Sequence, residues 1–259
     1  MNYPELIEWA KTAPTSGWDF SALFGDRMQE SEPSWRYPNM VRTHMHSGRR
    51  MLDMGTGGGE LLLSLRPLPE FTVATEGYGP NVPVAREALR PAGVSVVQIP
   101  EDEEAPLPFA DGSFDLIINR HEAYVPSEIV RVLRPGGVFV TQQVGGRDLC
   151  ELNEALGGTA HEFGDWDLGV AHAQLVQAGM NILECREEML PGLFRDIGAV
   201  ALFLRIAPWH IPDFDLDVNE TSLRALHKRI QKDGHFPVRH HRFVIRASKP
   251  KPADAAHSQ

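Results

Sequence analysis

The sequence predicts an α/β protein built on a doubly wound, mostly parallel sheet of seven strands. Two observations predict it: short apolar runs rich in β-forming residues alternate with helical stretches, and glycine or proline turns separate them. Strands that alternate with helices at this interval indicate βαβ units and a parallel sheet with helices on both faces. The composition agrees, because 42% apolar and 23% charged residues are ordinary for a globular chain of 259 residues.

The order of the elements follows from these runs. The expected strands cover residues 51–54, 71–75, 94–99, 114–118, 138–142, 181–186 and 243–247. The expected helices cover residues 60–65, 81–89, 127–133, 168–178 and 220–233. Pro80 and Pro126 stand near the starts of two of these helices, where proline is tolerated. Gly145-Gly146 and Gly157-Gly158 predict a glycine-rich connector after the fifth strand.

Two segments lie outside this alternation. Residues 1–47 are rich in tryptophan and are expected to form a helical N-terminal lid. Residues 191–234 are expected to be a helical insertion before the last strand, beginning with an apolar helix over 191–212 and covering the pocket. The main domain is expected to span 48–249, and residues 250–259 to be a disordered tail. Core packing and a pocket wall both remain possible for the aromatic residues Trp35, Tyr37, Phe194, Phe203 and Trp209.

The charge of the chain is unevenly distributed. The net charge is −10, yet nine Lys or Arg residues stand against one acidic residue between positions 224 and 251. A net acidic protein disfavours extended polyanions as partners, although a local basic strip can hold one anionic group. We therefore expect no nucleic-acid partner.

Cysteine usage and hydropathy predict a cytoplasmic protein. Only Cys150 and Cys185 are present, which is too few for a disulfide scaffold, so we expect two reduced and buried thiols. Residues 1–14 lack the basic stretch and apolar run of a secretion signal. No apolar run approaches the roughly 18 residues that a membrane span needs.

A glycine loop between the first strand and the first helix is the main ligand signal. Residues 55–59 read Gly-Thr-Gly-Gly-Gly, where the backbone can turn tightly and a ligand can approach the main chain. A dinucleotide fingerprint needs a third glycine where Glu60 stands, and a phosphate loop needs a lysine that is missing. Glu76 ends the second strand, at the spacing where an acid accepts both hydroxyls of a ribose. The pattern predicts a ligand with a ribose and without a pyrophosphate; a structural turn and a solvated acid are the alternatives.

Four motifs together resemble those of class I S-adenosylmethionine-dependent methyltransferases, in particular the small-molecule branch that includes the quinone-biosynthesis enzymes. The motifs are Asp53-x-Gly55-x-Gly57-x-Gly59, Glu76, residues 107–115 and residues 128–137. They occur in the family's order over about residues 48–145. The resemblance implies a Rossmann-like methyltransferase fold and S-adenosyl-L-methionine as cofactor.

The resemblance also implies a set of contacts. The implied cofactor-binding residues are Asp53, Gly55, Thr56, Gly57, Gly59, Glu76, Asp102, Glu103 and Asn119. The glycines would line the methionine part, with Asp53 ordering the loop, and Glu76 would bind the ribose hydroxyls. Asp102 and Glu103 are alternatives for the acid on the adenine amino group, and Asn119 would face the cofactor.

The segment after the fourth strand supplies the candidate for catalysis. A sulfonium methyl group needs no metal for in-line displacement, and a base is needed only if the acceptor must lose a proton. His121 is the candidate base, because histidine titrates near neutrality; a packing or loop-ordering role is the alternative. Glu122 orients His121 or is solvated, and Arg120 holds an anionic substrate group or forms a surface ion pair. We expect no metal, since neither His44-x-His46 nor His240-His241 fits a metal-binding pattern.

We therefore expect a methyltransferase that acts on O, N or C of a small molecule, aromatic or anionic in character. Two alternatives stay open. One is an RNA methyltransferase that uses the basic strip over residues 224–251, and the other is a non-catalytic cofactor-binding domain. The sequence leaves the acceptor and the oligomeric state open.

Overall fold

The computed structural model describes residues 1–13, 23–46, 49–100, 105–158 and 163–251. The chain forms two compact units, each with its own cluster of buried apolar side chains. Unit 1 comprises Met1–Ser34, Val144–Asp167 and Glu187–Arg242. Unit 2 comprises Trp35–Gln143, Leu168–Arg186 and Phe243–Gln259.

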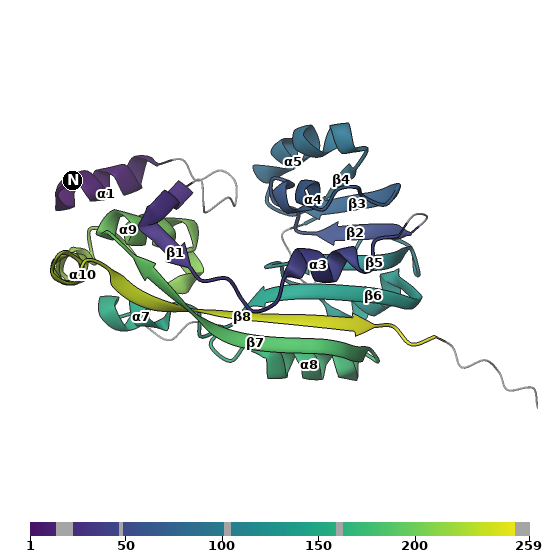
Figure 1. Cartoon of the computed structure of the whole chain (residues 1–259). Helices are drawn as coiled ribbons and strands as arrows, with labels where there is room; N and C mark the ends of the chain where they lie inside the picture. Colours follow the sequence, from purple (N-terminus) through teal and green to yellow (C-terminus); the bar gives the residue numbers. More distant parts are fainter. Residues whose placement is uncertain (14–22, 47–48, 101–104, 159–162, 252–259) are drawn as a thin grey trace, which may run out of the picture. The chain divides into compact units, whose positions relative to one another are not determined.

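A mixed sheet of eight strands has the order β1-β7-β8-β6-β5-β2-β3-β4 (Figure 1). The strands are β1 (Met28–Glu30), β2 (Arg50–Met54), β3 (Phe71–Glu76), β4 (Ser95–Gln98), β5 (Phe114–Arg120), β6 (Leu133–Val144), β7 (Asn181–Phe194) and β8 (Phe236–Ser248). The run from β6 through β5, β2 and β3 to β4 is parallel throughout. The α/β fold with a mostly parallel sheet is confirmed.

The described helices agree with the predicted ones except in the connector and the insertion. They are α1 (Tyr3–Thr12), α3 (Tyr37–Arg42), α4 (Glu60–Ser64), α5 (Asn81–Leu89), α6 (Pro126–Val132), α7 (Cys150–Leu156), α8 (Leu168–Gln177), α9 (Ile197–Ile206) and α10 (Glu220–Asp233). Short 3₁₀ helices are η1 (Gly25–Arg27), η2 (Arg90–Ala92) and η3 (Pro208–His210). Helix α7 forms inside the segment that was expected to be a connector, closed at its end by Gly157 in the left-handed conformation.

Two expectations about strands were wrong. Within the described residues the sheet has eight strands rather than seven, because Met28–Glu30, expected in a helical lid, pair antiparallel with Gly192–Phe194 of β7. Residues 191–194 are therefore strand and not the start of an apolar helix. The partner strand lies more than 160 residues away in the sequence, so local apolar content could not distinguish the two structures.

The register of unit 2 brings polar residues to one edge of the parallel sheet. Asp53 pairs with Ala74 on β3 and with Ile118 on β5. Glu76 ends β3, and Asn119 lies one residue before the end of β5. The apolar residues of β2 and β5 that precede these polar residues are buried in the core of unit 2. The packed core therefore fixes the positions of the carboxyl ends of these strands, where ligands bind in such sheets.

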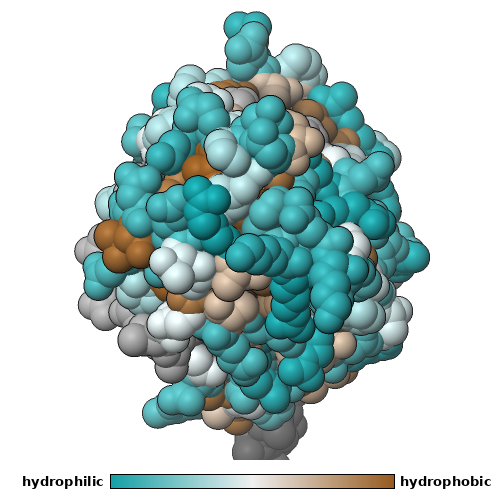
Figure 2. Space-filling view, turned by 90° about the vertical axis from the view of Figure 1, so that its left-hand side faces the viewer, coloured by the Kyte–Doolittle hydropathy of each residue, from teal (hydrophilic) through white to brown (hydrophobic). Residues whose placement is uncertain are grey.

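Unit 1 is built around α9. Its residues from Ile197 to Leu204 are all buried, and α9 packs against α1, which a capping box between Asn2 and Glu5 begins (Figure 1). The apolar segment is thus the centre of this unit's core. The face of the molecule that Figure 2 shows is mainly hydrophilic, with apolar side chains interspersed.

The cysteines and the aromatic side chains differ in how deeply they are buried. Both cysteines are free thiols, but Cys150 is only half-buried and Cys185 is exposed, so the expected burial was wrong. Core packing is the outcome for Trp35, Tyr37, Phe194 and Phe203, whereas Trp209 is exposed. Among the described helices, none is both long and apolar enough to cross a membrane.

Candidate functional site

The glycine loop joins β2 to α4 and its backbone is left-handed at three positions. Gly55, Gly57 and Gly59 have φ angles of 63°, 61° and 91°, which favour glycine. The N–H of Thr56 donates to the carbonyl oxygen of Thr75 at 2.9 Å, which fixes the loop to β3. A Cβ atom at Gly59 would lie 2.8 Å from Cγ of Leu89, so this position excludes a side chain.

Glu76 is held at the end of β3 by the backbone of two loops. Its Oε2 accepts a hydrogen bond from the N–H of Gly57 at 2.6 Å, and its Oε1 accepts one from Tyr78 at 2.9 Å. Burial raises the pKa of the carboxyl, while these N–H donors oppose the rise. A carboxylate accepts up to about four hydrogen bonds, so Glu76 can accept more.

Asp53 is the second buried acid of this edge. Its side chain is 3% exposed. Burial raises the pKa of Asp53 to about 7, and the nearby charge of Glu76 adds to this rise. Burial therefore favours the protonated form of this carboxyl, and a bound cation would favour its charged form.

Asn119 is completely buried and only partly satisfied. Its Oδ1 accepts from the hydroxyl of Thr141 at 3.0 Å and from Nε2 of Gln143 at 2.6 Å. Its Nδ2 has no hydrogen-bond partner among the described residues. The Tyr37 hydroxyl donates to the Asn119 carbonyl at 2.9 Å, which anchors this end of β5. A buried amide nitrogen without a partner among the described residues is the kind of group that a ligand can satisfy.

His121 and Glu122 follow directly after β5. His121 is exposed and has a left-handed backbone (φ 62°), with its N–H donating to the carbonyl of Gln142 at 2.8 Å. The side chain of Glu122 lies over Gly55, where an added Cβ would overlap its carboxylate. The structure thus brings a third acid to the glycine loop. Sequence reasoning did not predict this contact, and its signal was only the position of Glu122 beside His121.

The other predicted residues have different outcomes. Asp102 and Glu103 lie outside the described residues. Arg120 is exposed at the end of β5. In the described part of the chain no group of three His, Cys, Asp or Glu residues is arranged to hold a metal ion.

The basic strip over residues 224–251 is interrupted by internal contacts. Arg242 is buried and paired with Asp148 and Glu30, with Nη1 2.6 Å from Oδ1 of Asp148. Arg246 pairs with Glu184 at 3.2 Å. Lys249 donates to the backbone carbonyls of Val130 and Leu133. These three cations are therefore engaged by partners within the protein.

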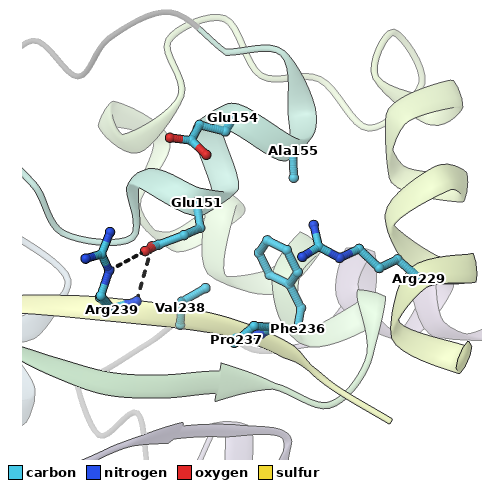
Figure 3. Close-up of a pocket in the computed structure, with 8 residues that line it drawn as sticks. All are labelled: Glu151, Glu154, Ala155, Arg229, Phe236, Pro237, Val238 and Arg239. Carbon is cyan, nitrogen blue, oxygen red and sulfur yellow. Dashed lines mark hydrogen bonds and ion pairs between the residues drawn. The ribbon is translucent and has the colours of Figure 1, made fainter. Parts of the chain in front are cut away.

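Each unit of the described structure has a cavity. One in unit 1, of about 410 Å³, contains none of the predicted site residues (Figure 3). In Figure 3 Glu151 pairs with Arg239, and Arg229 lies beside the ring of Phe236. The other, in unit 2, is about 640 Å³ and is lined by Ala123, Tyr124, Val125, Pro126, Gln174, Gln177 and Ala178. It therefore adjoins the segment that continues from His121 and Glu122.

Comparison with known families indicates which kind of domain contains this edge of the sheet. Residues 52–141, which contain the end of β2, the glycine loop, Glu76 and most of β6, match the family described as "Methyltransferase domain". Residues 52–141 form a methyltransferase domain. This match agrees with the methyltransferase motifs in the sequence, and YcgJ, a relative that is named as a methyltransferase, is similar over part of the chain.

Individual relatives support the methyltransferase domain and its fold. The uncharacterized methyltransferase YcgJ of Bacillus subtilis is 30% identical over 109 residues, which are 39% of this chain and 43% of YcgJ. The structure of BH2331 from Bacillus halodurans C-125 is 18% identical, with a TM-score of 0.60 over 83% of this chain and 99% of that one. The structure of the cyclase SpnF is 19% identical, with a TM-score of 0.54 over 96% of this chain and 92% of that one.

The residues of the methyltransferase domain fit S-adenosylmethionine. The left-handed glycines leave the loop without side chains, and Glu76 is a buried acceptor with lone pairs for hydroxyl donors. Asn119 offers a buried Nδ2 without a partner among the described residues. The carboxyls of Asp53 and Glu122 complement a ligand with positive charge.

Proposed function

We propose that the protein transfers the methyl group of S-adenosylmethionine to a small organic molecule. The observation that carries this proposal is Glu76, buried at the end of β3 and fixed by the glycine loop through Gly57. An acid in this position suits two ribose hydroxyls and supports an adenosyl ligand on the loop. The match to the methyltransferase family supports the reaction.

Each residue of the edge has a distinct task in this proposal. S-adenosylmethionine supplies a methyl group that its sulfonium centre already activates. Glu76 binds the ribose, Gly55, Thr56, Gly57 and Gly59 line the methionine part, and Asp102 or Glu103 binds adenine. Asp53 orders the loop and Asn119 faces the cofactor. The protein's main contribution is alignment and exclusion of water, which supplies roughly 7–11 kcal/mol in the best cases.

The acceptor is proposed to enter beside the segment that follows β5. The cavity of about 640 Å³ there has Tyr124, Gln174 and Gln177 in its wall, a mixture of aromatic and amide groups that suits a small organic molecule. We propose an aromatic or anionic acceptor, in keeping with the small-molecule, quinone-biosynthesis-like branch. Residues 1–47 and 191–234 are proposed as the segments that determine acceptor specificity.

Methyl transfer is tested with S-adenosylmethionine that carries a radiolabelled methyl group. The wild-type chain is incubated with this compound and a small-molecule extract, and the labelled product is identified by mass. We expect label in a small molecule with wild type and with Glu87→Gln, a charge-matched change on the exposed face of α5. We expect at least about ten-fold less with Glu76→Gln, since hydrogen bonds to a charged group contribute about 1.5–3 kcal/mol.

The two alternatives give different outcomes in the same experiment. Label in RNA, with a salt-dependent gel shift, would support the RNA methyltransferase; the commitment of Arg242, Arg246 and Lys249 to protein partners argues against it. Cofactor binding without label in any molecule would support the non-catalytic domain. The fold alone does not decide between these, because the similar structure SpnF is named as a cyclase.

A further inference from the structure

Two consecutive glutamines on β6 hold the segment that contains His121. Gln142 and Gln143 are both buried, and their side chains have separate sets of partners, as expected for neighbours on a strand. Gln143 donates through Nε2 to Asn119 and to the backbone carbonyl of Glu122 at 3.0 Å. Gln142 contacts His121 twice, through its backbone carbonyl at 2.8 Å and through its side chain. The position of His121 is therefore set by β6 as well as by its own strand.

The orientation of the Gln142 amide follows from its contact with Trp35. Nε1 of Trp35 lies 2.8 Å from Oε1 of Gln142, and both residues are buried. An indole nitrogen only donates, so the amide oxygen must point at Trp35. The opposite orientation would place two N–H donors against each other in a buried site. The amide nitrogen of Gln142 consequently points at His121.

This orientation determines where the proton of His121 resides. Nε2 of Gln142 lies 3.2 Å from Nε2 of His121, and an amide nitrogen is only a donor. Nε2 of His121 must then be the acceptor, and the proton of the neutral ring is on Nδ1. The left-handed backbone of His121 is a further sign that the surrounding structure fixes this residue.

We propose that Trp35 and Gln142 are positioning residues that hold His121 as the neutral tautomer protonated on Nδ1. In this state the lone pair of the ring is engaged by Gln142, so His121 acts as a hydrogen-bond donor and not as a general base. The relevance to catalysis rests on the proposed function. The inference narrows the acceptor class to molecules whose nucleophilic atom is already deprotonated at the reaction pH and needs no proton removal by His121, such as carboxylates or acidic phenols.

The tautomer is measured by two-bond ¹H–¹⁵N correlation spectra of the full chain labelled at its histidines. The resonances of His121 are identified by their loss in His121→Gln. We expect an unprotonated Nε2 in wild type. Gln142→Glu keeps an oxygen for Trp35 but offers His121 an acceptor, so the proton should move to Nε2. Gln231→Glu, an equal charge change at an exposed position of α10, should leave the spectrum of His121 unchanged.

Trp35→Phe provides a second test that does not add a charge. Without the indole N–H the amide of Gln142 can turn over, so both tautomers should appear. A wild-type His121 protonated on Nε2 would overturn the proposal, as would a tautomer that is the same in wild type, Gln142→Glu and Trp35→Phe. These spectra need neither cofactor nor acceptor, so a failure of the proposed function would show separately, as loss of S-adenosylmethionine binding or methyl transfer.

Discussion

At the residue scale, the buried carboxyl of Asp53 makes a pH-dependent contribution to stability. Its pKa is about 7 in the folded protein, whereas an unfolded aspartate titrates near 4. The folded state therefore binds this proton more tightly, and stability falls as pH rises from about 4 to about 7. Three pH units correspond to about 4 kcal/mol as an upper value.

The prediction concerns Asp53→Asn. Because asparagine does not titrate, this variant should lose less free energy of unfolding than wild type between pH 5 and pH 8. Urea unfolding at the two pH values measures the difference, and Asp165→Asn, at an exposed position, is the control. An equal pH dependence in wild type and Asp53→Asn would show that Asp53 is not the buried acid responsible.

Residue contacts were also where sequence reasoning was least complete. The glycine motif and Glu76 could be predicted because their spacing along one chain segment carries the signal. The contact between Glu122 and Gly55, and the pair Trp35 and Gln142, depend on residues from separate strands and loops. No local pattern predicts such contacts, and they emerge only when the strands are in register.

At the element scale, the turn into α4 depends on a glycine for two separable reasons. Gly59 has φ 91°, and a Cβ atom there would also lie 2.8 Å from Cγ of Leu89 on α5. Gly93 has φ 72° but open space around its Cβ position, so Gly93→Ala isolates the backbone cost. We expect Gly59→Ala to lower the free energy of unfolding by about 1–3 kcal/mol more than Gly93→Ala.

Denaturant unfolding of the two alanine variants measures this difference. Gly59→Ala should also weaken S-adenosylmethionine binding, since Gly59 is part of the glycine loop and begins α4, whereas Gly93→Ala should not. If the two variants are equally stable, the side chain of Leu89 can move aside without a loss of folding free energy. Close packing against α5 would then not be what fixes the loop.

The elements themselves were predictable where turn residues bound a local pattern. The helix over 81–89 lies between Pro80 and Pro91, and the structure has the same bounds. Strands β7 and β8 are longer than predicted, since pairing with distant strands extends them beyond their apolar runs. Strand β1 has three residues and no apolar pattern, so only its pairing with β7 identifies it.

At the scale of the whole molecule, the fold class was predictable because βαβ alternation repeats over a long stretch of the chain, from residue 51 to residue 142. The assembly of unit 1 could not be predicted, because this unit combines three separate segments from the amino-terminal, middle and carboxyl-terminal parts of the sequence. Its buried pair of Arg242 and Asp148 joins residues 94 positions apart. That residues 1–47 and 191–234 cover the pocket stays a prediction, which experiments with substrate can test.

The central claim is that the glycine loop and Glu76 bind S-adenosylmethionine, and isothermal titration calorimetry tests it most directly. We predict binding in the micromolar range for wild type and Glu87→Gln, and about ten-fold or greater weakening for Glu76→Gln. No measurable binding by the folded wild-type chain, or equal affinity in wild type and Glu76→Gln, would contradict the account.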